Sequence, residues 1–337
     1  MGNYQAFAAT ATGKSHKKIG KDCQDSACGY PTGANSIGRK AAAAVADGHG
    51  DDNCFRSKKG AEIASKCATV GLGDFLRAFE PSQEKSNDEV AKTLIKHIIS
   101  QWQIEVEADY SANKIRENEL AQANEKYRKK YENGESLNKA YGTTLIAAMA
   151  TERYWLGIHI GDGRFTVLYS DGTFDQPVPW DDKCFLNATT SICDDDAADR
   201  TRYCFFSNEE KEPPIAVFLC SDGVDDNYPA EENEKHLYKL YKTIAQTFVK
   251  DGFESTCGQL KELAEKFANE GKGDDTSIAG FLDMEELKKT VLKWEEKDKT
   301  KIDAEKPASV EITDADEPVN NPKDDAGIET YDVEKIL

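Results

Sequence analysis

The chain has 337 residues, of which 62 are acidic and 43 are basic, so its formal net charge is −19. This acidic excess argues against a nucleic-acid-binding protein, because neutralising phosphates needs clustered Lys and Arg. A hydrophobic content of 39% is enough to bury a large core, and no apolar run reaches the roughly 18 residues of a membrane span. The start of the chain lacks the pattern of a secretory signal.

The nine Cys are scattered at irregular intervals, with no Cys-x-x-Cys pair and no zinc-finger spacing. This usage favours reduced, mostly buried thiols. We therefore expect a cytoplasmic protein without a membrane partner, and we expect it to be a monomer.

The first 80 residues mix strand and helix signals. An alanine-rich apolar run at 41–46 ends at an Asp-Gly pair and predicts a buried strand that leads into a turn. Apolar residues in 59–79 recur at helical spacing. We expect that helix to break near Gly71 and Gly73, because glycine destabilises a helix interior.

Residues 81–138 are predicted to be a helical segment. Ser86 and Glu89 have the spacing of a capping box, and apolar side chains then recur at helical spacing as far as Trp102. The next stretch, 113–131, is highly charged, so it predicts a second helix that is largely exposed to solvent.

From residue 144 the pattern changes to short strands. Residues 144–151, 153–160 and 165–169 predict consecutive antiparallel strands, and Ser-Asp-Gly-Thr at 170–173 is a hairpin signal. Residues 175–213 are irregular and polar, and we expect a flexible, flap-like excursion there.

The remaining part of the body contains two further strands and two helices. Residues 214–220 and 276–282 read as strands, and apolar residues at helical spacing mark helices around 237–248 and 260–267. Because strands are grouped with strands and helices with helices, the pattern favours an α+β architecture over a strictly alternating one.

The composition shifts after residue 282. Residues 311–337 contain nine acidic side chains and two lysines. We therefore expect one domain over 1–282, followed by an acidic, disordered tail over 283–337.

Aspartates in turns are the candidate functional residues, and four of the five lie at one end of a predicted strand. A carboxylate there is held on a rigid scaffold, although Asp-Gly is also an ordinary turn pair. Several such carboxylates without basic neighbours repel one another when buried and need a cation. Oxygen ligands favour Mg²⁺ or Mn²⁺ over zinc. The five residues are Asp25, Asp47, Asp162, Asp222 and Asp274.

The order of the motifs around these aspartates resembles the type 2C family of metal-dependent serine/threonine protein phosphatases, and the opening segment is similar to its bacterial members. The resemblance covers about residues 5–282. It implies a four-layer αββα sandwich of two antiparallel sheets flanked by helices, with two metal ions in a cleft at one end. The matching motifs are Cys23-Gln24-Asp25-Ser26, Asp47-Gly48-His49-Gly50, Gly142-Thr143-Thr144, Gly161-Asp162-Gly163-Arg164, Ser221-Asp222-Gly223 and Asp274-Asp275-Thr276-Ser277.

The resemblance also implies roles for individual residues. Asp47 would bridge two Mn²⁺ or Mg²⁺ ions, and the Gly48 carbonyl would bind the second of them. Asp222 and Asp274 would hold the first ion. His49 would be the general acid that protonates the leaving oxygen of serine or threonine.

Further roles follow from the same resemblance. Asp25 would anchor metal-bound water, and Asp162 would join Asp222 at a third, weaker metal site. Gly20 stands where many members have an Arg that clamps the substrate phosphate, so this contact is either missing here or made by His16, Lys17 or Lys18.

The implied function is hydrolysis of phosphoserine and phosphothreonine in proteins by a hydroxide that bridges the two metal ions. Such an enzyme would act in signalling and oppose a serine/threonine kinase. Gln24 stands where many members have Glu. Together with Gly20, it leaves open a catalytically weak phosphoprotein-binding or scaffold module, or a metal-stabilised structural protein that docks through its tail.

Overall fold

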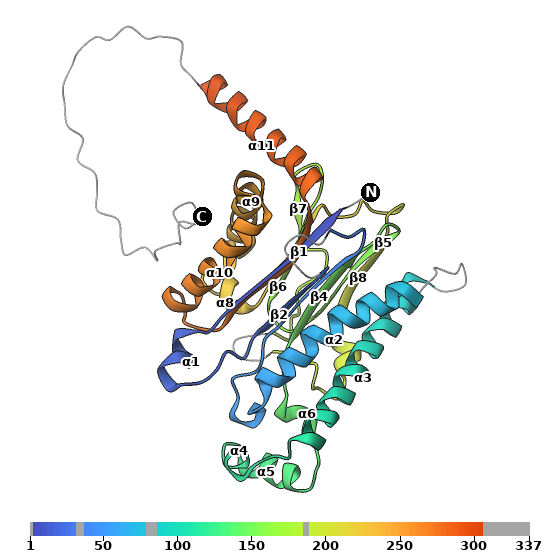
Figure 1. The fold of residues 1–337 in the computed structure, drawn as a ribbon, viewed down its shortest axis with the longest axis vertical. Coiled ribbons are helices and arrows are strands. Elements are labelled where there is room, and N and C mark those ends of the chain that lie inside the picture. The colour runs from blue at the N-terminus through green and yellow to red at the C-terminus, as the bar shows by residue number, and fades with distance from the viewer. Residues whose placement is uncertain (1–2, 32–36, 79–85, 185–188, 306–337) are drawn as a thin grey trace, which may run out of the picture.

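Two antiparallel sheets stacked face to face form the centre of the computed structural model, and helices cover both outer faces (Figure 1). The structure describes residues 3–31, 37–78, 86–184 and 189–305. The arrangement confirms the predicted α+β class and the four-layer αββα sandwich.

Each sheet has five strands, in the order β1-β10-β9-β6-β7 for the first and β2-β3-β4-β5-β8 for the second. The first sheet consists of β1 (Tyr4–Ala11), β10 (Thr276–Asp283), β9 (Ala216–Cys220), β6 (Arg164–Leu168) and β7 (Phe174–Asp175). The second consists of β2 (Ser26–Tyr30), β3 (Ala41–Ala46), β4 (Leu145–Ala150), β5 (Tyr154–Ile160) and β8 (Arg202–Ser207).

Long helices form the outer layers. The second sheet is covered by α2 (Ser57–Ala78) and α3 (Asn87–Ala112), and the first by α9 (Asn233–Asp251), α10 (Phe253–Glu270) and α11 (Met284–Glu305). The short elements are α1 (Lys14–Ile19), η1 (Asp52–Cys54), α4 (Glu117–Leu120), α5 (Glu125–Glu132), α6 (Leu137–Ala140), α7 (Ala197–Arg200), α8 (Asp222–Asp225) and η2 (Ala230–Glu232).

Small side chains let the two sheets approach each other. Strand β3 consists of five alanines and one valine, and all six are fully buried. Ala41, Ala43 and Val45 belong to the cluster between the sheets, which also contains Leu219 and Phe281. Close packing on both faces explains why alanine, a poor strand former, occupies a central strand.

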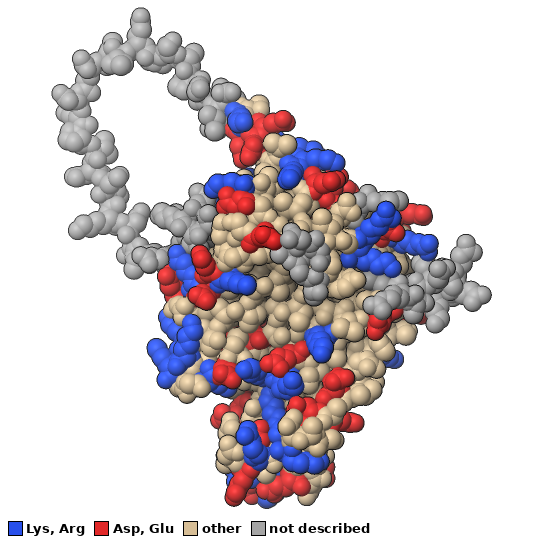
Figure 2. Space-filling model, in the orientation of Figure 1, with Lys and Arg blue, Asp and Glu red and all other residues tan. Residues whose placement is uncertain are grey.

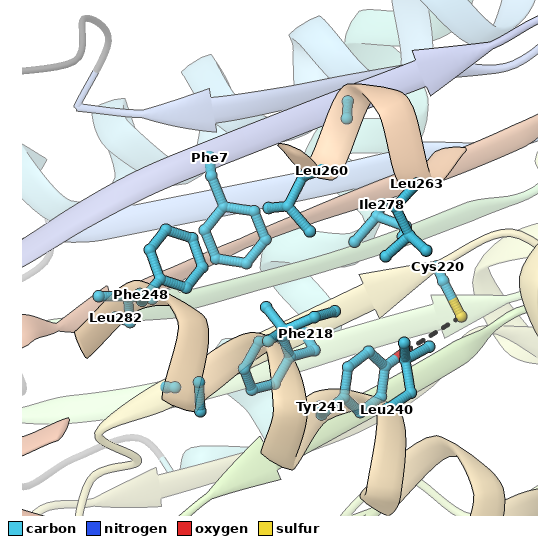
Figure 3. Packing of buried hydrophobic residues seen from close by; sticks show 14 of the residues in the cluster. Phe7, Phe218, Cys220, Leu240, Tyr241, Phe248, Leu260, Leu263, Ile278 and Leu282 are labelled. Atoms are coloured by element: carbon cyan, nitrogen blue, oxygen red, sulfur yellow. Dashed lines mark hydrogen bonds between the residues drawn. The ribbon is translucent and has the colours of Figure 1, made fainter. Parts of the chain in front are cut away.

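Aromatic rings fix α9 and α10 on the first sheet (Figure 3). The ring of Tyr241 stacks on that of Phe218 with 4.6 Å between centroids, and its hydroxyl donates to Sγ of Cys220 at 3.2 Å. Phe7 packs against both Phe218 and Phe248. The buried hydroxyl therefore has a partner, and the rings contribute a large apolar area.

Helix α2 is continuous, so the predicted break near Gly71 and Gly73 is wrong. The helix packs against α3 and the second sheet, and a Cβ on Gly71 would lie only 3.5 Å from Cγ1 of Ile98. Packing against these neighbours outweighs the roughly 1 kcal/mol that a helical glycine costs relative to alanine.

The helical segment after residue 81 is partly as predicted. The capping box is present, because Ser86 Oγ accepts from the Glu89 N–H at 3.3 Å and Glu89 Oε2 accepts from the Ser86 N–H at 3.0 Å. The exposed helix predicted over 113–131 is instead divided into α4 and α5. The Asn124 side chain accepts from the Tyr127 N–H at 3.1 Å and so begins a new helix there.

Charged side chains of both signs cover the lobe formed by α4 and α5, at the bottom of the view in Figure 2. Helix α5 begins with a glutamate and has two lysines in its last turn, which suits the helix dipole. This composition explains why the sequence predicts a solvated helix without showing where it is interrupted.

The segment 175–213 is not irregular throughout, because it contains β8, which pairs with β5 at the edge of the second sheet. Only Cys204 is buried among the six residues of β8. A single buried position gives weak alternation, so the pattern did not predict this strand. Strands β1 and β2 were not identified from the sequence either.

Helix α11 follows directly on β10, where the sequence predicts the start of a disordered tail. Leu287, Val291 and Trp294 lie on one face of the helix and are buried against the α9–α10 layer. The predicted boundary at 282 is therefore wrong. The many charged residues around Leu287, Val291 and Trp294 hid the helical spacing of these three side chains in the sequence pattern. The rest of the predicted tail, 306–337, lies outside the described residues.

None of the helices in the described ranges carries an apolar stretch long enough to cross a membrane.

Replacing the fully buried Leu287 by alanine should lower the free energy of unfolding by about 2–4 kcal/mol, because the substitution leaves a cavity. Leu292 on the same helix is 56% exposed, and Leu292→Ala should cost less than about 0.5 kcal/mol. Urea unfolding followed by tryptophan fluorescence measures both changes. Equal, small effects of the two substitutions would contradict the docking of α11.

Candidate active site

The register of the second sheet places Asp25 beside Asp47. Ser26, the first residue of β2, pairs with Ala46, the last residue of β3. Residues that pair in an antiparallel sheet lie opposite each other. The residue before Ser26 and the residue after Ala46 therefore leave the sheet at the same end, and both are aspartates.

The first sheet groups three further aspartates in the same way. Strand β6 begins two residues after Asp162, and its first residue pairs with the last residue of β9, two residues before Asp222. Strand β10 begins two residues after Asp274 and lies beside β9. All three carboxylates thus lie near the same end of the first sheet.

A hydrogen-bond chain joins the two groups across the sandwich. The Ser221 hydroxyl donates to Oδ2 of Asp25 at 2.7 Å, and its oxygen accepts from the Ser277 N–H at 2.9 Å. Asp25 belongs to the second sheet, whereas the two serines belong to the first. The five predicted aspartates are therefore gathered at one end of the stacked sheets.

Burial and mutual repulsion raise the pKa of these carboxyls. Burial raises the pKa of Asp47 well above its usual range, and the charges of Asp25, Asp222 and Asp162 add to the effect. Burial also raises the pKa of Asp25, followed by the charges of Asp275 and Asp222. Both shifts mean that the folded chain holds negative charge here at a cost in free energy.

Asp47 and Asp222 act on each other electrostatically, because each carboxyl affects the pKa of the other. Burial, followed by the charge of Asp162, raises the pKa of Asp222 to about 7. Burial likewise raises the pKa of Asp162 and of Asp274.

The carboxylates do not form a ready set of metal ligands. In the ranges that the structure describes, no group of three or more His, Cys, Asp and Glu side chains is arranged to hold a metal ion. However, Oδ1 of Asp25, Oδ1 of Asp222 and Oε1 of Gln24 are buried oxygens without a hydrogen-bond partner. Such orphaned acceptors are rare in folded proteins and mark where a cation could be accommodated.

Gly48 lies where the backbone passes close to its neighbours. A Cβ on this residue would lie 2.6 Å from the carbonyl oxygen of Gln24 and 2.9 Å from that of Ser57. Any side chain would therefore push the turn away.

The metal-binding roles assigned to Asp25, Asp47, Gly48, Asp162, Asp222 and Asp274 stay predictions.

Gln24 supports the turn that carries Asp47. Its carbonyl oxygen accepts from the Gly48 N–H at 3.2 Å, and its side-chain amide donates to Oγ of Ser57 and, at 3.5 Å, to the carbonyl of His49. Its own N–H donates to Oδ2 of Asp275 at 2.6 Å. The neutral side-chain amide therefore supports the turn, and the backbone N–H of Gln24 links it to Asp275 beside the first sheet.

His49 lies against Gly142. Its N–H donates to the Gly142 carbonyl at 3.1 Å, and a Cβ on Gly142 would lie 2.8 Å from Cδ2 of the imidazole. Burial, followed by the charge of Lys139, lowers the pKa of His49 to about 4. The imidazole is therefore neutral at pH 7 in this state, and it could act as an acid only if bound negative charge raised that pKa.

The two predicted phosphate-binding side chains both contact neighbouring residues. Nδ1 of His16 lies 2.9 Å from Oδ2 of Asp275, and Nζ of Lys17 donates to Oδ1 of Asn269 at 2.9 Å. Their role in substrate binding stays a prediction.

Sequence reasoning missed an ion pair beside the cluster. Arg164 contacts Oδ2 of the buried Asp225 at 2.7 Å, and its guanidinium lies 3.9 Å from the ring centroid of Trp180. The side-chain amide of Asn233 donates to the Asp225 carbonyl at 2.8 Å. Arg164 lies in the Gly161–Arg164 motif, but Asp225 lies beyond the Ser221-Asp222-Gly223 motif, and their pairing depends on the neighbouring strands β6 and β9.

Several solved structures are similar to this chain. The serine/threonine phosphatase Stp1 from Staphylococcus aureus is 19% identical, with 84% of this chain and 95% of that chain covered and a TM-score of 0.46. The Mycobacterium tuberculosis serine/threonine phosphatase PstP/Ppp is 13% identical, with 83% of this chain and 99% of that chain covered and a TM-score of 0.45. The catalytic domain of PstP in complex with two manganese ions is 16% identical, with 83% of this chain and 98% of that chain covered and a TM-score of 0.47. No match was found among the curated proteins.

The family comparison is more decisive than these distant structural similarities. The sequence model of the family described as protein phosphatase 2C matches residues 12–264, which is more than half of the chain. The chain therefore belongs to the protein phosphatase 2C family, and it is a protein phosphatase.

Proposed function

We propose that this protein hydrolyses phosphoserine and phosphothreonine esters in proteins and that it needs two Mn²⁺ or Mg²⁺ ions, with a third possible. The observation that carries the proposal is the group of mutually repelling carboxylates at one end of the sandwich, of which Asp25 is buried and Asp47, Asp162 and Asp222 are partly buried. In the described residues, two of its oxygens, on Asp25 and Asp222, have no hydrogen-bond partner.

The residues present fit a hard divalent cation. The donors are carboxylate and backbone oxygens, which Mn²⁺ and Mg²⁺ accept and which differ from the Cys and His ligands that zinc favours. A cation would offset the repulsion that raises the pKa of Asp47 and Asp222. Binding would then release protons from these carboxyls, because a ligand carboxylate must be deprotonated.

Four residues would hold the two ions. Asp47 and the Gly48 carbonyl, together with Asp222 and Asp274, would provide the ligands, and Asp162 would help to hold a third ion. When bound, the two ions would lower the pKa of the attacking water and counter the charge on the phosphoryl oxygens.

Other residues of the chain keep these ligands in place. Thr143 Oγ1 and the Thr144 N–H both donate to the Asp47 carbonyl at 2.8 Å, which fixes the backbone of the turn. The Ser221 hydroxyl orients Asp25, which would anchor metal-bound water. Fixed supporting hydrogen bonds of this kind keep a site in its productive geometry.

His49 would supply the proton that the leaving oxygen needs. The imidazole is neutral at pH 7 as the structure stands, because burial and Lys139 lower its pKa. A bound phosphate dianion beside the ring would raise that pKa and favour the protonated form. The ring nitrogen could then protonate the serine or threonine alkoxide.

Some earlier expectations stay predictions. These are the opposing kinase, the monomeric state, the cytoplasmic location, and the role in signalling. Membership of a phosphatase family favours turnover over a module that only binds phosphoproteins or serves as a scaffold, and the following measurements decide between them.

Purified protein should release phosphate from a phosphothreonine peptide when Mn²⁺ is added, and a chelator should abolish the reaction. Asp222→Asn should lower the rate by at least about 10²-fold, because it removes a ligand charge. The exposed Asp195 provides a matched control, and Asp195→Asn should leave the rate unchanged. Equal rates for Asp222→Asn and the unmodified protein would rule out metal-dependent hydrolysis at this carboxylate cluster.

The stability of metal-free protein should depend on pH in a direction that the buried carboxyls determine. The pKa of Asp222 is raised to about 7, so the folded state binds more protons than the unfolded state between about pH 4 and pH 7. The free energy of unfolding that this group contributes therefore falls as the pH rises through that interval.

Asp222→Asn removes the titrating group, so metal-free Asp222→Asn protein should unfold at a higher temperature than the unmodified protein. The difference should be larger at about pH 7.5 than at about pH 5. Differential scanning calorimetry in chelator measures it, with Asp195→Asn as the control. A lower melting temperature for Asp222→Asn at both pH values would show that the carboxylate is not repelled by its surroundings.

His49→Gln should lower kcat by about 10²-fold or more with a phosphothreonine peptide, because an alkoxide must be protonated as it leaves. With p-nitrophenyl phosphate the loss should be less than about tenfold, since nitrophenolate leaves without a proton. The exposed His97 provides the control variant His97→Gln. An equal loss with both substrates would contradict the general-acid role.

A further inference from the structure

Helix α1 differs from the long helices because none of its side chains is buried. Polar contacts, rather than a hydrophobic core, hold it at the end of the sandwich. The Ser15 N–H donates to the Gly273 carbonyl at 3.0 Å, and Lys14 Nζ donates to the Gly271 carbonyl at 3.3 Å. The helix therefore gains little from packing, and its outer surface is open to solvent.

Four lysines on and directly after α1 form a basic surface that we call the α1 patch. It consists of Lys14, Lys17, Lys18 and Lys21. The first three are spaced by three and four residues, so they lie on one side of the helix. No acidic residue occurs within 14–21, although the whole chain has a net charge of −19. Basic side chains also gather at the left edge of Figure 2, where Figure 1 places α1.

The acidic side chains at the border of the α1 patch already have basic partners. Three ion pairs lie there, with separations of 2.9, 2.8 and 3.9 Å: Asp22 with Lys58, Asp226 with Lys272, and Glu270 with Lys266. Lys17 donates to the neutral side chain of Asn269 at 2.9 Å. No ammonium group of the patch has a carboxylate as an ion-pair partner among the described residues. The patch can therefore accept an acidic ligand.

The α1 patch also contains an apolar side chain. Ile19 is 75% exposed, more than any other large hydrophobic residue in the described ranges. It is surrounded in the sequence by the lysines of the patch. A ligand that carries both carboxylates and apolar side chains would match this surface.

A segment of that kind occurs later in the same chain. Residues 324–334 contain five acidic side chains and no basic one, together with Ile328, Tyr331 and Val333. The segment lies outside the described residues, and it follows α11, which ends at Glu305. Its composition complements both the charge and the apolar side chain of the α1 patch.

The chain is long enough for this segment to reach α1. Strand β10 begins three residues after Gly273, and α11 then leads away from α1 (Figure 1). The end of α11 lies at most about 70 Å from α1, given the rise per residue of a strand and of a helix. Residues 324–334 can extend about 63–96 Å beyond Glu305, whereas the acidic residues within 311–317 can extend only about 40 Å.

We infer that residues 324–334 bind the α1 patch of the same chain. Opposite charges and the exposed Ile19 provide the attraction, and the covalent connection gives the segment a high effective concentration near the patch. A single exposed ion pair contributes little, so several must act together. Dissolved salt should weaken the contact, because it screens exposed charges.

The bound segment would lie beside the candidate active site. Nδ1 of His16 on α1 lies 2.9 Å from Oδ2 of Asp275, the residue after the proposed metal ligand Asp274. Lys17 is also a candidate for contact with the substrate phosphate. The acidic segment would therefore compete with phosphoprotein substrates, and this consequence rests on the proposed function.

Carbodiimide treatment of the full chain tests the contact, because the reagent joins a carboxyl and an amine that touch each other. Mass spectrometry should find links from 324–334 to the α1 patch at least about fivefold more often than to Lys250 and Lys261, which are exposed on α9 and α10. In about 0.5 M NaCl this preference should disappear. Equal linkage to the patch and to the two reference lysines, or links only between separate chains, would overturn the inference.

Neutral substitutions in the full chain test the competition. One variant removes four charges from the distal segment: Asp325→Asn, Glu329→Gln, Asp332→Asn and Glu334→Gln. A matched variant removes four charges of the same types from the stretch that falls short of α1: Glu311→Gln, Asp314→Asn, Asp316→Asn and Glu317→Gln. At low salt, KM for a phosphothreonine peptide should be about threefold lower in the first variant than in the second, with equal kcat. Equal KM values would contradict the competition.

The two experiments separate this inference from the proposed function. If the protein releases no phosphate when Mn²⁺ is added, the proposed function fails, whereas preferential linkage to the α1 patch would still support the contact. If hydrolysis is observed without that preference, the proposed function stands and the inference is overturned.

Discussion

The structure depends on several carboxylates being held close together at one end of the sandwich. Burial together with neighbouring carboxylates raises the pKa of Asp47 and of Asp222. Such an arrangement lowers the stability of the chain unless a cation is bound. It persists because the rest of the sandwich fixes the backbone from which these side chains extend.

That backbone is fixed by ordinary packing. Strand β3 is buried on both faces, and its small side chains let the sheets approach each other. The antiparallel register then determines which residues leave the sheets at the same end. Gln24 and Ser221 join the two sheets just beneath the carboxylates. The sandwich is therefore the scaffold, and the turns at one end provide the chemistry.

Much of the fold could be predicted from the sequence because its signals are local. The apolar run of β3, the hairpin after β6 and the capping box of α3 each depend on residues close together in the chain. The weaker predictions failed where distant contacts decide the structure. Packing against α3 keeps α2 continuous through two glycines, and the docking of three apolar side chains against the α9–α10 layer orders α11.

In the candidate site too, the sequence reveals the local motifs but not the contacts between distant residues. The aspartates and His49 could be found because each belongs to a short motif, and the register of the sheets explains their convergence. The partner of Arg164 could not be found, because the pairing of Arg164 with Asp225 depends on the neighbouring strands β6 and β9. Pairing between strands leaves no signal in the spacing of residues.

The account is tested most directly by titrating the metal-free protein with Mn²⁺ in two buffers of different ionisation enthalpy near pH 7. Because burial and neighbouring carboxylates raise the pKa of Asp47 and of Asp222, cation binding near pH 7 should release protons from these carboxyls, seen as a buffer-dependent heat. Binding accompanied by that release would support the carboxylate cluster as the cation site. The absence of binding, or binding with no proton released, would contradict it.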